Sequence, residues 1–278
     1  IKRTHAALRS EGLVPNDDLS SPYWTEMLGA VAEFDLERAK REEEAEKQRD
    51  TSIIDALSFM ESRVNRNDYA IIIGNSEYGH DLIPNVTPAH KDVEAFKKYA
   101  LEGLGIPPEN IIVLKDATKT EMENWLGKKE DHQGLLYNRL FGQGRLGKIY
   151  FYYSGHGVPS VNDRNAYLVP VDANPEVYNI SGYPLATLYE NISLLPASER
   201  HVVIEACFSG GSSSGDLVKN ASSGFLSLNE GEIPLNINAA TATSSGEIAS
   251  WDEGNGNSIF TKYYLLGVSG RADANGDR

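Results

Sequence analysis

The sequence predicts an α/β protein in which helices flank a mostly parallel central sheet on both faces, with an N-terminal helical extension before it. From residue 69 onward, short β-rich runs alternate with helical stretches, whereas the first 66 residues contain no convincing strand. Apolar strands that alternate with helices are typical of parallel sheets covered on both faces. A chain of 278 residues is long enough for one such domain with an appendage.

The N-terminal segment, residues 1–66, is predicted to be helical. Residues 37–50 are nearly all charged, and both signs recur at spacings of three and four, which favours a solvated single helix. The apolar side chains that offer a packing surface for a second short helix are Ile53, Ile54, Leu57, Phe59 and Met60. The segment is therefore either a helical lid packed on the following domain or a regulatory, partner-binding arm.

The rest of the chain, residues 67–278, alternates between strands and helices. Strands are predicted at residues 69–74, 110–115, 148–153, 166–171, 202–206 and 236–242. Helices are predicted at residues 88–104, 118–140 (broken near Gly134), 184–194 and 258–266. In such sheets, functional side chains gather beyond the carboxyl ends of the strands.

The composition excludes several functional classes. The formal net charge of −14 argues against a nucleic-acid partner, because a phosphate backbone needs Lys and Arg to replace its counterions. The apolar runs are too short to span a bilayer, and no secretory signal follows the first residue, so neither a membrane partner nor secretion is expected. A single cysteine excludes an internal disulfide and favours a reducing, cytoplasmic location.

One histidine and the only cysteine follow two predicted strands in the same way. Residues 148–153 lead into the motif SGHG, which contains His156, and residues 202–206 lead into CFSGG, which begins with Cys207. If the two strands are adjacent and parallel, the imidazole and the thiol lie within reach of each other. A lone cysteine is more often a buried apolar residue, but the matching positions of the two residues favour a catalytic pair.

The chemistry of acyl transfer requires such a pair. A thiolate attacks a carbonyl carbon, and a nearby imidazole favours the thiolate and later protonates the leaving amine. The negatively charged oxygen of the intermediate needs hydrogen-bond donors, and the backbone N–H groups of Gly157 and Cys207 are the expected ones. His156 is therefore the predicted general base and Cys207 the predicted nucleophile.

The motifs YFYYSGHG and VVIEACFSGG resemble the His and Cys boxes of caspase-like cysteine peptidases (family C14), particularly the metacaspase and orthocaspase branch. A histidine roughly 50 residues before the cysteine agrees with this family. Further segments that resemble it, in the same order, are residues 69–78, 87–92, 167–172, 240–247 and 258–261. The resemblance covers about residues 70–268 and implies a caspase-haemoglobinase fold that hydrolyses peptide bonds.

The resemblance also implies a substrate preference. In the metacaspase branch an acidic pocket selects Arg or Lys at P1, the residue whose carbonyl is attacked, and the matching acids here are Asp92 and Glu205. Two carboxylates near the nucleophile would bind a cationic side chain and repel an acidic one. Asp92 also suits the start of a helix, where the macrodipole favours an acid. Metacaspase-like sequences usually carry Asp where Glu205 stands, and Glu-Ala-Cys also resembles legumain-like enzymes, which prefer Asn or Asp.

The same resemblance divides the second region into a large-subunit-like part (67–208), a flexible loop (209–231) and a small-subunit-like part (232–278). This family is often cut in such a loop during activation, and Lys219 is the candidate self-cleavage site if P1 is basic; an ordinary flexible loop is the alternative. No cofactor is required by the sequence and no metal site is evident, although Ca²⁺ is a candidate because many metacaspase-like enzymes bind it. Residues 273–277 have the alternating oxygen ligands of a calcium loop but lack its glycine and distal glutamate.

The sequence thus predicts a cysteine endopeptidase that acts on protein or peptide substrates, with basic P1 residues preferred. One alternative is a catalytically silent caspase fold that serves as a binding or scaffold module. Another is a peptidase with Asp or Asn at P1. In a third, a regulatory partner bound to residues 1–66 controls activation.

Overall fold

The computed structural model describes residues 36–38, 40–41, 57–59, 63–142, 144–160, 165–208, 211–212, 215–216, 232–242 and 256–272. The chain forms two compact units, Ile1–Arg49 and Asp50–Arg278. In the first unit the described residues are helical and exposed, and Glu37 and Arg41 form an ion pair of 3.5 Å one turn apart. This agrees with the helix predicted from mixed charges at a spacing of four.

The second unit is built on a five-stranded sheet in the order β10-β7-β3-β1-β2, and every pair of neighbours is parallel. The strands are β1 (Tyr69–Gly74), β2 (Ile111–Lys115), β3 (Lys148–Ser154), β7 (Glu199–Glu205) and β10 (Asn238–Thr241). β1 is buried along its whole length, as a strand covered on both faces should be. The prediction of a mostly parallel sheet is confirmed.

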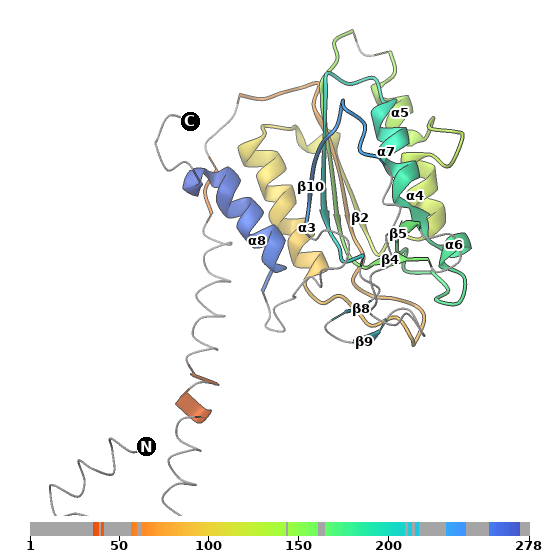
Figure 1. Cartoon of the computed structure of the whole chain (residues 1–278). Helices are drawn as coiled ribbons and strands as arrows, with labels where there is room; N and C mark the ends of the chain where they lie inside the picture. The colour runs from red at the N-terminus through yellow and green to blue at the C-terminus, as the bar shows by residue number, and fades with distance from the viewer. Residues whose placement is uncertain are drawn as a thin grey trace, which may run out of the picture. The chain divides into compact units, whose positions relative to one another are not determined.

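Helices cover both faces of this sheet (Figure 1). On one face lie α3 (Ala89–Lys98) and α8 (Ile259–Leu266); on the other lie α4 (Lys119–Leu126), α5 (Leu135–Leu140) and α7 (Leu185–Ser193), with the short α6 (Tyr178–Ser181) below them. Alternate residues of each strand enter the two layers, because successive strand side chains point to opposite faces. In β1, Ile71 and Ile73 join the core with α4, α5 and α7, whereas Ile72 joins the core with α3 and α8.

A small antiparallel sheet lies beside the carboxyl ends of the main strands and corrects one prediction. It consists of β4 (Gly157–Pro159), β5 (Ala166–Leu168) and β6 (Tyr183–Pro184), and a separate hairpin contains β8 (Gly211–Ser212) and β9 (Gly215–Asp216). The strand predicted at residues 166–171 forms only over residues 166–168, and it belongs to this antiparallel sheet and not to the parallel one. The chain continues directly from β3 into β4, and β5 pairs back on β4 with Gly157 opposite Leu168. The strand ends before Pro170, which has no N–H to donate.

Two predicted helices are modified by local geometry. The helix predicted at 88–104 is α-helical only to Lys98 and ends in a π-helical turn, Tyr99–Gly103. The break expected near Gly134 begins earlier, at Gly127, whose φ of 82° lies in the left-handed region that favours glycine. The helix start at Thr118 is a capping box with Glu121, since the side chain of each bonds to the backbone N–H of the other.

The short helix expected around residues 53–60 is absent at its described positions. Residues 57–59 are not helical, but Leu57 and Phe59 are buried in the core with α3 and α8. The ring of Phe59 lies 5.1 Å from that of Tyr99, centroid to centroid. The apolar residues predicted to pack on the domain thus do so here without a helix.

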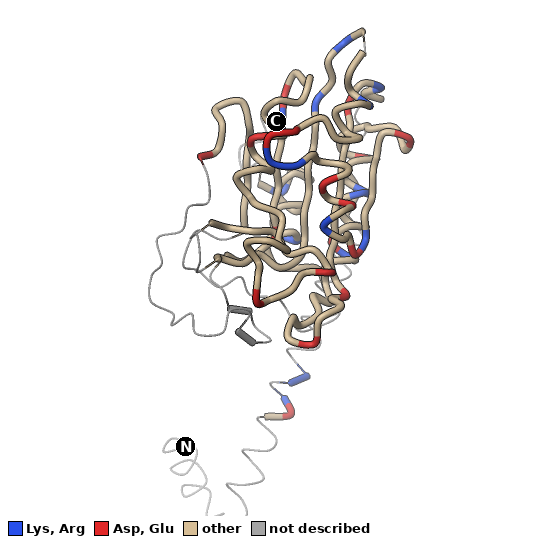
Figure 2. The backbone as a smooth tube through the Cα atoms, turned by 90° about the vertical axis from the view of Figure 1, so that its right-hand side faces the viewer, with Lys and Arg blue, Asp and Glu red and all other residues tan. Residues whose placement is uncertain are grey.

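Acidic loops lie at the carboxyl ends of the main strands. Two loops at the carboxyl ends of the strands, residues 75–88 and 169–177, contain acidic residues and no Lys or Arg. In Figure 2, Asp and Glu positions (red) gather at the lower end of the second unit. Among the residues that the structure describes, no helix combines the length and the apolar character needed to cross a bilayer.

Candidate active site

His156 and Cys207 follow neighbouring strands in the same register. In the ladder between β3 and β7, Ser154 lies opposite Glu205, and the Gly155 N–H donates to the Glu205 carbonyl at 3.2 Å. His156 and Cys207 each come two residues after this matched pair. Both are buried, with 1% and 3% of their surfaces exposed. The parallel ladder therefore carries the imidazole and the thiol to the same edge of the sheet.

The segments that carry the two residues are in direct contact at Gly157. A Cβ atom at this position would lie 2.8 Å from the carbonyl oxygen of Cys207 and 2.6 Å from Cε1 of Phe208. Distances below 3.0 Å are not found for real Cβ atoms, and one of the two obstacles is backbone. The glycine after His156 is thus required for the two chain segments to meet.

We expect Gly157→Ala to separate these segments. The free energy of unfolding should fall by about 1–3 kcal/mol because the added methyl overpacks the contact. The predicted peptidase activity should fall by about 100-fold, since displacements of 1 Å have that effect. Thermal unfolding and peptide hydrolysis measure the two effects. Gly144→Ala is the matched control, because no atom lies within 4 Å of a Cβ there; equal behaviour of the two variants would contradict the expected crowding.

The imidazole of His156 is held by the loop between β1 and α3. Its Nε2 lies 2.7 Å from the carbonyl oxygen of Pro84. A carbonyl oxygen only accepts hydrogen bonds, so Nε2 carries the proton and Nδ1 keeps the lone pair. The backbone N–H of His156 donates to the hydroxyl of Tyr78 at 2.9 Å. The centroids of the imidazole and the Tyr78 ring lie 4.9 Å apart. The tautomer that this geometry selects has Nδ1 ready to accept a proton.

Burial sets the charge state of this histidine. Loss of water contact lowers the pKa of His156 to about 4, and the bond to Pro84 opposes this only partly. At neutral pH the imidazole is therefore uncharged. An uncharged, oriented imidazole is the form that a general base requires.

Asp92 lies on α3, is fully buried, and accepts four hydrogen bonds. Its Oδ1 accepts from Asn257 Nδ2 at 3.0 Å and from the Ser258 N–H at 2.9 Å. Its Oδ2 accepts from Ser154 Oγ at 2.8 Å and from Ser258 Oγ at 2.5 Å. Burial nevertheless raises the pKa of Asp92. The carboxyl group thus ties α3 to β3 and to the start of α8.

Glu205 lies at the end of β7 and is equally buried, with 2% of its surface exposed. Its Oε2 accepts the Thr261 N–H at 3.0 Å, and Thr261 Oγ1 lies 2.6 Å from the hydroxyl of Tyr152. Burial and, secondly, the charge of Asp92 raise the pKa of Glu205 to about 8. Within the part of the chain that the structure describes, neither carboxylate has an ion-pair partner. The two acids therefore form a buried carboxyl pair without a cation.

Sequence reasoning identified the paired residues but not their supports. Pro84 acts through its backbone carbonyl, which leaves no signature in a sequence. Tyr78, Ser258 and Thr261 occur in segments that resemble the peptidase family, yet their contacts with His156, Asp92 and Glu205 follow only from the three-dimensional arrangement.

Several predicted features lie outside the described residues. These are Lys219, the candidate self-cleavage site, and residues 273–277, the segment with the alternating ligands of a calcium loop. Within the described ranges, no group of three or more His, Cys, Asp and Glu side chains is placed to hold a metal ion.

Comparison with known proteins finds a family model and solved structures that match this chain. The family model of the caspase domain, peptidase family C14, matches residues 67–268. A solved structure, the crystal structure of caspase-1 from Spodoptera frugiperda, is similar with a TM-score of 0.48 and 15% sequence identity over 77% of this chain and 73% of that chain. Comparison with curated proteins gives no match.

Proposed function

The chain belongs to the caspase-domain family of peptidases, and from this premise we propose that it is a cysteine endopeptidase with Cys207 as nucleophile and His156 as general base. The observation that carries the proposal is the shared register of the two strand ends, with Ser154 opposite Glu205 two residues before the paired groups. It is supported by the bond from His156 to Pro84, which leaves Nδ1 as the proton acceptor.

The proposed reaction has two stages. In the first, Nδ1 of His156 takes the thiol proton and Sγ of Cys207 attacks the substrate carbonyl carbon, while the N–H groups of Gly157 and Cys207 bind the oxyanion. The C–N bond then breaks as His156 gives its proton to the leaving amine, and a thioester remains. In the second, His156 takes a proton from water, whose oxygen attacks the thioester, and the proton passes to the departing thiolate of Cys207.

The proposed P1 residue is Arg or Lys. Asp92 and Glu205 form a buried carboxyl pair in which burial and, secondly, the charge of Asp92 oppose the ionisation of Glu205. A guanidinium or ammonium group would relieve this repulsion and bond to both. The acidic loops at the same edge of the sheet would attract a basic peptide and repel an acidic one. This preference supports assignment to the metacaspase-type branch of the family.

Control of the enzyme is part of the proposal. Cleavage after Lys219 would follow from a basic P1 preference. Residues 1–66 are the proposed site for a regulatory partner, and Ca²⁺ is the proposed effector.

A panel of fluorogenic peptides with Arg, Lys, Asp or Asn at P1, with and without calcium, tests the proposal against its alternatives. We expect turnover of the Arg and Lys peptides, none by Cys207→Ala, and labelling of Cys207 by a thiol-reactive peptide probe. A catalytically silent binding module would neither hydrolyse any peptide nor take up the probe. Turnover after Asp or Asn alone would retain the peptidase but refute the acidic pocket.

A further inference from the structure

We call residues 75–88, which join β1 to α3, the histidine-holding loop. It reaches His156 from two sides, through the Tyr78 hydroxyl and the Pro84 carbonyl. Inside the loop, the Tyr78 N–H donates to Oδ1 of Asn85 at 3.0 Å, which keeps the two halves of the loop together. The position of the imidazole therefore depends on how this loop is fastened to the sheet.

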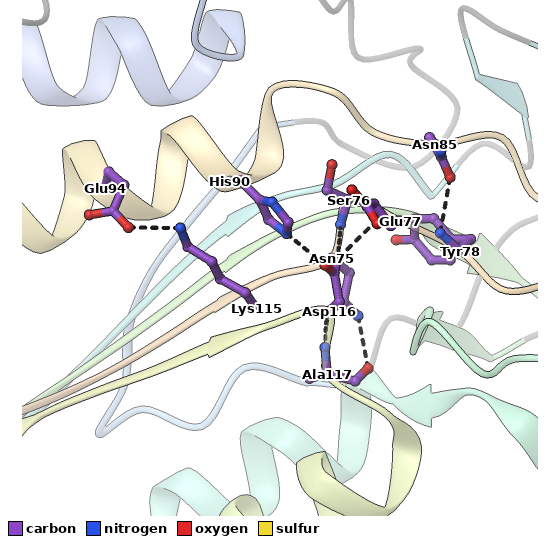
Figure 3. A network of polar contacts seen from close by, with 10 residues as sticks. All are labelled: Asn75, Ser76, Glu77, Tyr78, Asn85, His90, Glu94, Lys115, Asp116 and Ala117. Atoms are coloured by element: carbon purple, nitrogen blue, oxygen red, sulfur yellow. Dashed lines mark hydrogen bonds and ion pairs between the residues drawn. The ribbon is translucent and has the colours of Figure 1, made fainter.

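One carboxylate fastens both ends of the histidine-holding loop (Figure 3). Asp116 directly follows β2, and its Oδ1 accepts the N–H groups of Ser76 at 2.8 Å and Glu77 at 2.9 Å, at the beginning of the loop. Its Oδ2 lies 3.0 Å from Nε2 of His90, in the first turn of the helix that follows the loop. Nε2 of His90 makes no hydrogen bond, so this second contact is electrostatic.

Asp116 is itself fixed to the sheet. Its N–H donates to the Gly74 carbonyl at 2.8 Å. The next residue, Ala117, donates its N–H to Oδ1 of the fully buried Asn75 at 2.8 Å. Asp116 has a φ of 55°, in the left-handed region, which Asp, Asn and Gly adopt more readily than other residues. The carboxylate therefore projects from a rigid support.

We propose that Asp116 is a positioning residue of the peptidase reaction, which fixes Pro84 and Tyr78 against His156 by clamping the histidine-holding loop. The inference rests on the proposed function, because it concerns the same general base. Asp116 acts through the loop. Without the two hydrogen bonds that Asp116 accepts from Ser76 and Glu77, the loop would shift. The His156 ring would then lose its contact with the Pro84 carbonyl, which selects its tautomer. Misplacement of a reacting group by about 1 Å lowers a rate by up to about 100-fold.

Two substitutions of Asp116 separate this role from a general effect on stability. Asp116→Gly removes the carboxylate, and glycine adopts the left-handed backbone without strain. We expect kcat for the preferred peptide to fall by about 10- to 100-fold. KM should change by less than about threefold, because the carboxylates proposed to bind the substrate, Asp92 and Glu205, lie elsewhere. Alkylation of Cys207 by iodoacetamide near neutral pH should slow in parallel. Asp116→Asn keeps both an acceptor and the backbone conformation, and should restore kcat to within about threefold of wild type.

Glu121→Ala is the matched control, because Glu121 also bonds to a backbone N–H, that of Thr118, but at the start of α4. It should lower the melting temperature and leave kcat unchanged. Equal kcat in Asp116→Gly and Glu121→Ala would overturn the positioning role while the proposed function stands. Absence of hydrolysis by the wild type would overturn both. If Asp116→Gly does not fold, the exposed Asn85→Ala replaces it, and an unchanged kcat there would overturn the proposal.

Discussion

Replacing His156 by alanine is expected to lower kcat for the preferred peptide by about 10³- to 10⁴-fold, with little change in KM. The reason is that Nδ1, which carries the lone pair when Nε2 donates to Pro84, is the group proposed to accept the thiol proton. Steady-state kinetics measure the loss. Alkylation of Cys207 supplies a second measurement, because the thiolate is the form that reacts and the loss of the imidazole should make alkylation slower near neutral pH.

His156→Gln is the sharper control. Its side-chain amide can still donate to Pro84 but has no basic nitrogen, so it should be as inactive as His156→Ala; activity in it would refute the general-base role. The variant also changes acid stability. In the wild type the unfolded chain binds a proton at pH about 6.5 and folded His156 only at about 4. Stability should therefore fall by roughly 3 kcal/mol as the pH drops across that interval, and His156→Gln should lack this loss in urea unfolding at each pH.

Asp92→Asn is expected to lower kcat/KM for peptides with Arg at P1 by about 100-fold, while the melting temperature changes little. The retained Oδ1 still accepts from Asn257 and the Ser258 N–H, and the new amide can donate to the hydroxyls of Ser154 and Ser258, which can rotate to accept. Only the charge is lost, and hydrogen bonds to a charged group are worth about 1.5–3 kcal/mol. Asp92→Ala also leaves the buried N–H donors unpaired. The free energy of unfolding of this variant should therefore fall by about 2–5 kcal/mol.

The pH dependence of kcat/KM for peptides with Arg at P1 tests whether Glu205 binds the substrate. Its pKa of about 8 means that the carboxyl group is protonated at lower pH and cannot attract a cation. The kcat/KM for Arg peptides should therefore rise as the pH increases through about 8, and Glu205→Gln should remove that rise. A neutral P1 peptide serves as the comparison, since its hydrolysis should not follow this ionisation. An unchanged profile in Glu205→Gln would exclude Glu205 from substrate binding.

Most of the fold is predictable because its pattern is local. The predicted strand at 69–74 coincides with β1, and the helices at 184–194 and 258–266 agree with α7 and α8 within two residues at each end. The strand at 166–171 was misassigned because its partner is chosen by tertiary structure. Residues 157–159 follow β3 as β4 and pair antiparallel with β5. The sequence of β5 does not distinguish a parallel neighbour from an antiparallel one.

The candidate site divides in the same way. His156 and Cys207 are recognisable as candidates because their side chain types suit the proposed chemistry and their glycine neighbours mark the strand ends. The contacts that tune them come from backbone groups, such as the Pro84 carbonyl, or from common polar residues far away in sequence. Asp116 bonds to residues about 40 positions earlier in the chain, and no local pattern signals such a contact.

The way in which the sheet places His156 beside Cys207 also bears on when the protein can become a peptidase. The two residues are 51 positions apart in the chain and meet only after β3 and β7 have paired. Pairing of parallel strands across such a separation is a slow, late event in folding. During synthesis the proposed base emerges before the proposed nucleophile, and a partly folded chain has the thiol but no adjacent imidazole. If the two residues act as proposed, an immature chain should therefore be unable to cleave neighbouring proteins.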